Sequence, residues 1–164
     1  MLAACAQAPG AIVVRDAAIH AGVLGAHLQW QPDPDVLAAL DHGIALTFVA
    51  TVCAQTRGAL GQLRTQVVAR RHLQLRYFPL SRQYQLRDLD HDHIRSYPVR
   101  ALALAALEDL RLALPDWSAQ NVQRYTLQIT LDRGALPGAL RLPALLHSAW
   151  HISSQEYSWP APAA

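Results

Sequence analysis

The sequence predicts an α+β fold, with a predominantly antiparallel β-sheet or a two-layer β-sandwich and two short helices. Apolar and polar residues alternate strictly along several runs, most clearly between His72 and Arg87. Short turn signals, rather than long connections, separate these runs. In two segments, near residues 34–42 and 98–114, the apolar residues instead recur with a helical period.

The length and composition predict a single folded domain. The chain has 164 residues, of which 52% are hydrophobic and 16% are charged. A domain of this size buries about 70% of the surface that its unfolded chain exposes. We expect one globular domain over residues 11–159, a signal-peptide remnant or disordered tail at 1–10, and a disordered tail at 160–164. All 14 basic residues are arginine, but they are dispersed and the formal net charge is only +2, which argues against a nucleic-acid partner.

The domain is predicted to open with a β-hairpin and a short helix. Residues 12–20 and 23–30 are strand-like, and Ala21-Gly22 between them suits a tight turn. Asp33 is a suitable N-cap and Pro34 suits the first helical position. We therefore expect a two-turn helix directly after the hairpin.

The next segments are predicted to form the centre of the sheet. The run from Ile44 to Val52 is apolar on both faces, which predicts a strand that is covered on both sides. From Thr65 the chain returns as a long strand into a second hairpin, whose turn is Pro79-Leu80-Ser81. One face of this hairpin is apolar and the other is polar, because successive strand residues point to opposite faces.

The C-terminal half is predicted to contain one helix and two strands. Pro98 lies in the first turn of the helix and Pro115 ends it. Residues 125–132 alternate as a half-buried strand, and Leu136-Pro137-Gly138 suits a turn. The last strand is expected to carry three apolar residues inward, namely Leu146, Trp150 and Ile152.

The first eight residues resemble the end of an export signal. Leu2-Ala3-Ala4-Cys5 fits the lipoprotein cleavage pattern, and Ala6-Gln7-Ala8 fits ordinary signal cleavage. We expect an exported protein of the periplasm or outer envelope, with Cys5 as the lipidation site if the lipoprotein pattern applies; the alternative is an untethered tail in an alanine-rich chain. No later run approaches the roughly 18 apolar residues of a membrane span. Membrane contact is therefore expected only through a lipidated Cys5.

The sequence shows no recognisable reaction centre. It has neither a G-x-S-x-G motif nor a catalytic cysteine signature. Ser153-Ser154 lies beside His151, but neighbours on a strand point to opposite faces. His91 and His93 have the spacing of two zinc ligands, yet no third ligand is evident, and a loop of alternating Asp and His is more often a solvated turn. We expect no enzymatic activity, no cofactor and no metal site, with His91 and His93 as weak metal candidates.

The polar face of the second hairpin is the best candidate binding surface. Arg76 and Arg87 lie on this face and Arg82 lies at the turn. A guanidinium group can bind a carboxylate through two hydrogen bonds. The alternative is a solvated sheet face whose arginines cover apolar rims with their stems.

Several short motifs occur in a fixed order along the chain. They are ALDHGIALTF at 39–48, LRY at 75–77, LSRQY at 80–84, AL at 101–102, LD at 131–132 after Tyr125, LP at 136–137 before Leu140, and WHISS at 150–154. With these motifs the sequence resembles the domain of unknown function (DUF) 4390 family, which is found mainly in proteobacteria and usually carries a signal peptide. The resemblance implies an exported cell-envelope protein with no assigned activity and no catalytic residues to carry over. It also implies a signalling partner, because genes of the family often lie near a nitrogen-type sensor histidine kinase.

Together these observations predict a non-enzymatic cell-envelope module that binds a protein partner, such as the periplasmic region of a sensor kinase. The alternative is a carrier of a small apolar ligand in a cavity of the sandwich. Such a cavity would be lined by residues such as Phe48, Tyr84, Leu127 and Trp150. A cavity between the layers would favour the carrier, whereas a packed interior beside an exposed sheet edge would favour the partner module.

Overall fold

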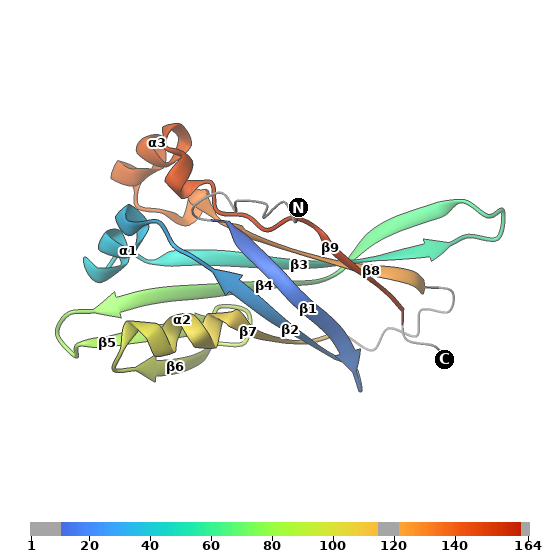
Figure 1. Ribbon diagram of the computed structural model, residues 1–164, viewed down its shortest axis with the longest axis horizontal. Helices are drawn as coiled ribbons and strands as arrows, with labels where there is room; N and C mark the ends of the chain where they lie inside the picture. The colour runs from blue at the N-terminus through green and yellow to red at the C-terminus, as the bar shows by residue number, and fades with distance from the viewer. Residues whose placement is uncertain (1–10, 115–121, 162–164) are drawn as a thin grey trace, which may run out of the picture.

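Two antiparallel β-sheets pack face to face, with helices around one end of the molecule (Figure 1). The computed structural model describes residues 11–114 and 122–161. The smaller sheet has the strand order β1-β2-β7, and the larger has the order β6-β5-β4-β3-β8-β9. In chain order the elements are β1 (Ile12–His20), β2 (Val23–Trp30), α1 (Pro34–Asp41), β3 (Leu46–Arg57), β4 (Leu63–Phe78), β5 (Gln83–Asp88), β6 (His93–Tyr97), α2 (Arg100–Glu108), β7 (Asp109–Ala113), β8 (Val122–Leu131), the 3-10 helix η1 (Arg133–Ala135), α3 (Gly138–Leu146), the 3-10 helix η2 (Ser148–Trp150) and β9 (Tyr157–Pro160). The predicted α+β class and antiparallel two-layer architecture are confirmed.

The predicted opening hairpin is present as β1 and β2. His20 pairs with Val23, so that Ala21 and Gly22 form a two-residue turn. Both have positive φ, 49° and 76°, as a type I′ turn requires. The right-handed twist of the flanking strands favours this kind of turn, which explains why so short a connection suffices.

The predicted first helix is also present, as α1. The Asp33 side chain accepts a hydrogen bond from the backbone N–H of Asp35 at 2.9 Å and Pro34 is the first helical residue. Gly43 follows the helix with a φ of +86°, which a residue with a side chain rarely adopts. Val36 and Leu40 are fully buried and anchor the helix on the core.

Strand β3 lies inside the larger sheet, as predicted, but it is fully covered on one face only, because Val49, Thr51 and Cys53 of the outer face are partly exposed. It pairs with β4 on one side and with β8 on the other. Its inner face contributes a continuous row of buried residues, because side chains of one face recur every second residue. This row consists of Leu46, Phe48, Ala50, Val52 and Ala54.

Strand β4 extends well beyond its neighbour β5. β5 pairs only with the segment from Leu73 to Phe78, so residues 63–71 have β3 on one side and no strand of the described chain on the other. A register shift opposite Val52 and Cys53 places one extra β4 residue, Val68, in this segment as a β-bulge. The β3–β4 hairpin projects from one end of the molecule in Figure 1. The larger sheet therefore has an open, bulged edge along half of β4.

The helix predicted over 98–114 is correct only in its first half. α2 ends at Glu108, and β7 follows as a strand that pairs with β2. Leu110 and Leu112 are buried while the residues between and beside them are exposed, which is the period of a strand. Leucines at 107, 110 and 114 fit a helical period equally well. Pairing with the edge of β2 favours the strand over the helix. A local pattern cannot reveal this pairing, because β2 and β7 are far apart in the sequence.

The strand predicted to carry Leu146, Trp150 and Ile152 inward is wrong. Residues 138–146 form a third helix, α3, which the sequence analysis missed, and Leu146 is exposed. Trp150 and Ile152 are buried, but they lie in η2 and in the segment after it. Gly138 begins α3 rather than ending a turn, because Pro137 takes the extended N-cap conformation. The last strand is instead β9, which pairs with β8.

The core lies between the two sheets. Trp30 of β2 meets Phe48 of β3 edge to face, with ring centroids 5.0 Å apart, a geometry that aromatic pairs favour. β9 ends at Pro160, and the Ala161 N–H donates to the Gln123 carbonyl at 3.1 Å. Residues 1–10 and 162–164, where tails are expected, lie outside the described residues.

Candidate binding site

The three hairpin arginines lie as the alternation predicts. Arg76 stands opposite Gln85 and Arg87 opposite Gln74 in the β4–β5 ladder. Both therefore point from the outer, polar face of the larger sheet. Arg82 lies in the turn between the strands and has a positive φ of 52°.

Two of these arginines are already engaged within the protein. The Arg76 guanidinium lies 4.9 Å from the centroid of the Phe78 ring, and its Nε donates to the Gly43 carbonyl at 3.2 Å. Arg87 forms an ion pair with Asp92. Arg82 has no hydrogen bond or ion pair with any described residue. Of the three, Arg82 is thus the most available to a ligand.

An open groove of about 640 Å³ lies beside Arg82. Its floor contains the rings of Tyr77 and Tyr84, whose centroids are 4.6 Å apart. The Tyr84 hydroxyl donates to Asp41 Oδ1 at 2.7 Å, and Arg100 forms an ion pair with the same carboxylate. Burial and this hydrogen bond raise the pKa of Tyr84 to about 12. An aromatic floor with a cationic rim is suited to an extended peptide segment.

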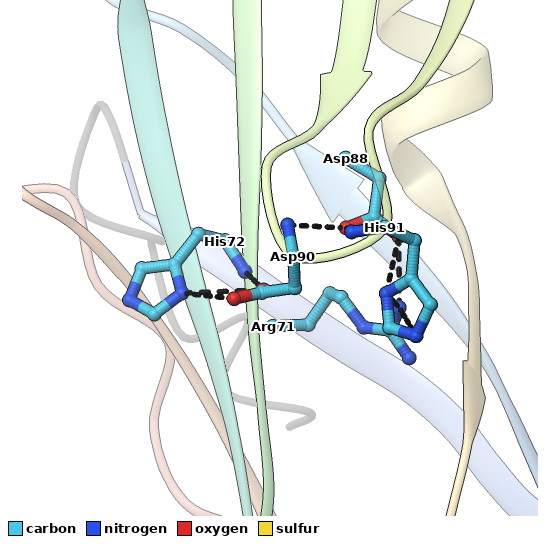
Figure 2. Close-up of polar contacts among 5 residues, drawn as sticks. All are labelled: Arg71, His72, Asp88, Asp90 and His91. Atoms are coloured by element: carbon cyan, nitrogen blue, oxygen red, sulfur yellow. Dashed lines mark hydrogen bonds and ion pairs between the residues drawn. The ribbon is translucent and has the colours of Figure 1, made fainter.

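A second polar cluster surrounds Arg71, at the place where β4 meets the β5–β6 turn (Figure 2). The Arg71 side chain is only 10% exposed, and its Nη1 donates to Asp88 Oδ2 at 2.8 Å. Asp88 Oδ1 accepts from the backbone N–H groups of Asp90 and His91 at 3.0 and 3.2 Å. The His91 ring contacts the Arg71 guanidinium as well. The Asp88 carboxylate therefore stabilises the β5–β6 turn and also neutralises the buried charge of Arg71.

The neighbouring residue His72 binds the other side of the same turn. Figure 2 shows Arg71 and His72 directed to opposite sides of β4. The His72 backbone N–H donates to Asp90 Oδ2 at 2.6 Å, and its ring Nδ1 lies 3.2 Å from Asp90 Oδ1. Partial burial alone would raise the pKa of Asp90, but the hydrogen bonds from the His72 backbone and ring outweigh it and lower this pKa. The cluster is a structural clamp between β4 and the β5–β6 turn.

The two histidines singled out for metal binding have different surroundings. His91 lies in the turn, where its ring contacts Arg71 and approaches Asp88. His93 begins β6 and stands opposite Asp88. Within residues 11–114 and 122–161, no group of three or more His, Cys, Asp or Glu side chains is arranged to hold a metal ion. The guanidinium of Arg71 would also repel a cation at His91.

The serine pair near His151 has a structural role in this fold. Ser154 is buried, and its hydroxyl accepts a hydrogen bond from the Ile129 N–H at 2.9 Å. The His151 ring contacts the Leu145 carbonyl at 3.2 Å. His151 does not lie on a strand, contrary to the sequence analysis, because the chain forms η2 just before it.

Helix α3 carries an apolar stripe that the sequence analysis missed. Leu142, Leu145 and Leu146 are 72%, 54% and 83% exposed. Their spacing of three and four residues places them on one side of the helix. The spacing is present in the sequence, but the turn signal at 136–138 and the strand expected after it point away from a helix.

Among the described residues, no ligand-sized cavity lies beside Phe48 between the sheets, where an apolar-ligand carrier would need one. The space next to Phe48, between the sheets, measures about 10 Å³, enough for about one water molecule. Leu127 and Trp150 are buried in the core, whereas Tyr84 lines the open groove instead. Cys5, the expected lipidation site, lies outside the described residues.

Comparison with known families assigns the chain to one of them. A family model described as Domain of unknown function (DUF4390) matches residues 14–160, nearly the whole of the described chain. The chain belongs to the DUF4390 family. None of the curated proteins or solved structures compared with it is significantly similar. In this DUF4390 domain, none of the described helices is both long and apolar enough to cross a membrane.

Proposed function

We propose that this DUF4390 domain is a non-enzymatic module of the cell envelope that binds a protein partner. One observation carries the proposal, which is the exposed stripe of Leu142, Leu145 and Leu146 on α3. Scattered single leucines are normal on a protein surface, whereas a contiguous apolar stripe is typical of an interaction site.

The opposite side of α3 is apolar as well. Ala144 is fully buried and Leu140 packs against the core. The charged residue of α3, Arg141, donates from its Nε to the Leu136 carbonyl within the protein. A helix with apolar residues on two opposite sides is normally covered on both of them. Full burial of one leucine contributes about 1.5–3 kcal/mol, so a partner that covers the stripe gains enough to offset a substantial part of the association entropy.

The hairpin arginines are proposed to assist this binding rather than to provide most of its free energy. The β4–β5 turn with Arg82 and helix α3 lie toward the same end of the long axis in Figure 1. Charges at the rim of an interface mainly accelerate encounter with an oppositely charged partner. Arg82 is the best placed for this, because Arg76 and Arg87 already have partners within the chain.

Support for the envelope location comes from the sequence. The Leu2-Ala3-Ala4-Cys5 and Ala6-Gln7-Ala8 segments fit export signals. A sensor kinase with a periplasmic region is the kind of partner that the family resemblance implies. A carrier of apolar ligands has less support, because the space of about 10 Å³ between the sheets is far below the roughly 300 Å³ of typical ligand sites.

Site-specific photo-crosslinking in the envelope of living cells tests this proposal. A photoreactive amino acid replaces Leu142 in one variant and Leu60 in the control, because Leu60 is exposed in the β3–β4 turn at the opposite end of the molecule from α3. We expect a discrete protein adduct from position 142 that is absent or much weaker from position 60. The same adduct should be lost when Leu145→Glu is added, because a buried unpaired carboxylate opposes binding.

The adduct also identifies the partner. Its mass and peptides show whether it is a different envelope protein or a second copy of this chain, and either one supports a protein-binding role. Adducts with lipid alone, or equal adducts from positions 142 and 60, would contradict the proposal. Failure of the chain to reach the envelope at all would contradict the location.

A further inference from the structure

A cleft of about 270 Å³ opens between the two sheets at the edge of the molecule. Its apolar floor comes from both layers. Its rim carries charged groups from β5, β6 and β7. The floor consists of Leu73, Leu86, Ala106 and Leu110, and the rim of Asp88, His93, Arg95, Asp109 and Arg111.

The strand register explains why these rim residues converge. Arg95 stands opposite Leu86 and His93 opposite Asp88, so both point to the inner face of the larger sheet. β7 is the edge strand of the smaller sheet. Its alternate residues Asp109 and Arg111 are exposed beside that edge.

The carboxylates of the rim are balanced within the protein. Asp88 is held by the buried guanidinium of Arg71 at 2.8 Å and by two backbone N–H groups. Asp109 Oδ2 lies 3.7 Å from Arg111 Nε, and its Oδ1 lies 3.8 Å from His27 Nε2. Arg95 and His93, in contrast, have no hydrogen bond or ion pair with any described residue. The cleft thus presents an unpaired guanidinium and an unpaired imidazole above an apolar floor.

We propose that this cleft binds a carboxylate that bears a short apolar group, with the carboxylate on Arg95 and the apolar group against the partly exposed Leu73 and Ala106. The buried side chains of Leu86 and Leu110 lie directly beside that contact. A planar guanidinium matches a carboxylate through two parallel hydrogen bonds. Arg111, whose Nε lies 3.7 Å from Asp109, adds a second positive charge at the rim. Because Arg95 is exposed to solvent, the apolar contact with the floor must add to the hydrogen bonds for the acid to be retained. This binding is separate from the proposed contact of α3 with a protein.

The volume limits the ligand to a small group. A cleft of about 270 Å³ is at the lower end of the range for ligand sites. Two sources fit this chemistry, namely a free short-chain acid and the carboxyl terminus of a peptide that ends in an aliphatic residue. Both bring one negative charge and one apolar chain.

The test uses two acids as probes. Hexanoate represents the free acid and N-acetyl-leucine represents the peptide terminus, while hexanamide and N-acetyl-leucinamide are the neutral controls. NMR spectra with assigned leucine methyl groups follow the titration of the full chain. We expect saturable shifts of the Leu86 and Leu110 methyl signals with one or both acids and much weaker binding of the amides. The acid that binds more tightly identifies the source.

Variants distinguish the contribution of the Arg95 guanidinium to acid binding from nonspecific effects of removing a positive charge. Arg95→Gln should weaken binding of the acid at least about tenfold, because a hydrogen bond to a charged group is lost. Arg111→Gln, in strand β7, tests in the same way whether the second guanidinium of the rim contributes to the affinity for the acid. The matched control is Arg124→Gln, an exposed arginine of β8 outside the cleft, which should leave binding unchanged; melting temperatures verify that each variant is folded.

Three outcomes would overturn the proposal. They are equal binding of acids and amides, unchanged binding by both the Arg95→Gln and Arg111→Gln variants, and shifts at Leu86 and Leu110 that fail to saturate at tens of millimolar acid.

Discussion

At the residue scale, Arg71 is the one charged residue that is buried among the described residues. Ala50 lies opposite it in β3, and the small alanine leaves room for the guanidinium on the inner face. A buried cation is tolerated only when it is paired and hydrogen-bonded. Asp88 meets this need, because the β5–β6 turn holds its carboxylate in place.

Replacement of Arg71 should strongly destabilise the protein. Arg71→Met leaves Asp88 half-buried without its cation, and loss of one partner of a buried pair typically costs about 3–5 kcal/mol. Arg70→Met is the control, because Arg70 is exposed on the opposite face, and it should change stability by less than about 0.5 kcal/mol. Urea midpoints measure both. Equal midpoints would show that the Asp88 carboxylate does not depend on Arg71.

Asp90 should make stability depend on pH in the acid range. Its pKa is lowered from the ordinary value of 3.8 in the folded chain. The ionised form is therefore favoured by folding, and this contribution is present above pH 3.8 and is lost as the pH falls through the lower folded value. The difference in unfolding free energy between the parent and Asp90→Asn should shrink from neutral pH to about pH 3.

Urea unfolding at both pH values measures this difference. Asp92→Asn serves as the control, because Asp92 is largely exposed and pairs with Arg87 instead. A difference between the parent and Asp90→Asn that stays constant with pH would mean that the contacts of His72 do not favour the ionised carboxylate.

At the scale of single elements, the sequence predicts best where one local signal dominates. The first hairpin and α1 follow from a turn dipeptide, an N-cap and a terminal glycine, all of which act within a few residues. The errors occur in leucine-rich segments, where helical and strand periods coincide. β7 becomes a strand because β2 offers it a ladder, and α3 becomes a helix although Pro143 interrupts it.

The first turn still contains a residue in an unfavourable conformation. Ala21 has a φ of 49°, in the left-handed region that asparagine and glycine adopt more readily than alanine. Ala21→Asn should therefore stabilise the protein by about 1 kcal/mol, measured as a higher urea midpoint. The control is Ala18→Asn, at an exposed position of the preceding strand β1. It should not stabilise the protein, since asparagine is disfavoured in strands. A lower midpoint for Ala21→Asn would contradict the turn assignment.

At the scale of the whole molecule, alternation predicts faces but not the order of strands. The division of the hairpin into Arg76 and Arg87 on one side and Tyr84 on the other could be predicted, because it depends only on period. The groove at Tyr77 and the cleft at Arg95 could not, since each combines elements that are distant in the chain. The clamp between Arg71 and Asp88 was missed for the same reason.

The open edge of β4 has a consequence for aggregation. Unpaired N–H and C=O groups along residues 63–71 are a template on which another chain can form a ladder. The bulge at Val68 interrupts that template, and Arg64 and Arg70 place charge on its two faces. Bulges and charged side chains are the means by which natural sheets avoid edge-to-edge growth.

The double variant Arg64→Gln, Arg70→Gln should consequently fold with nearly the parent's urea midpoint but aggregate faster at high concentration, as followed by light scattering. Arg124→Gln, on a strand paired on both sides, should not. If all three chains scatter alike over time, the bulge alone is a sufficient barrier. The bulge and the charges together explain how β4 can extend past its neighbour with an open edge, because an irregular, charged edge is a poor template for a second chain.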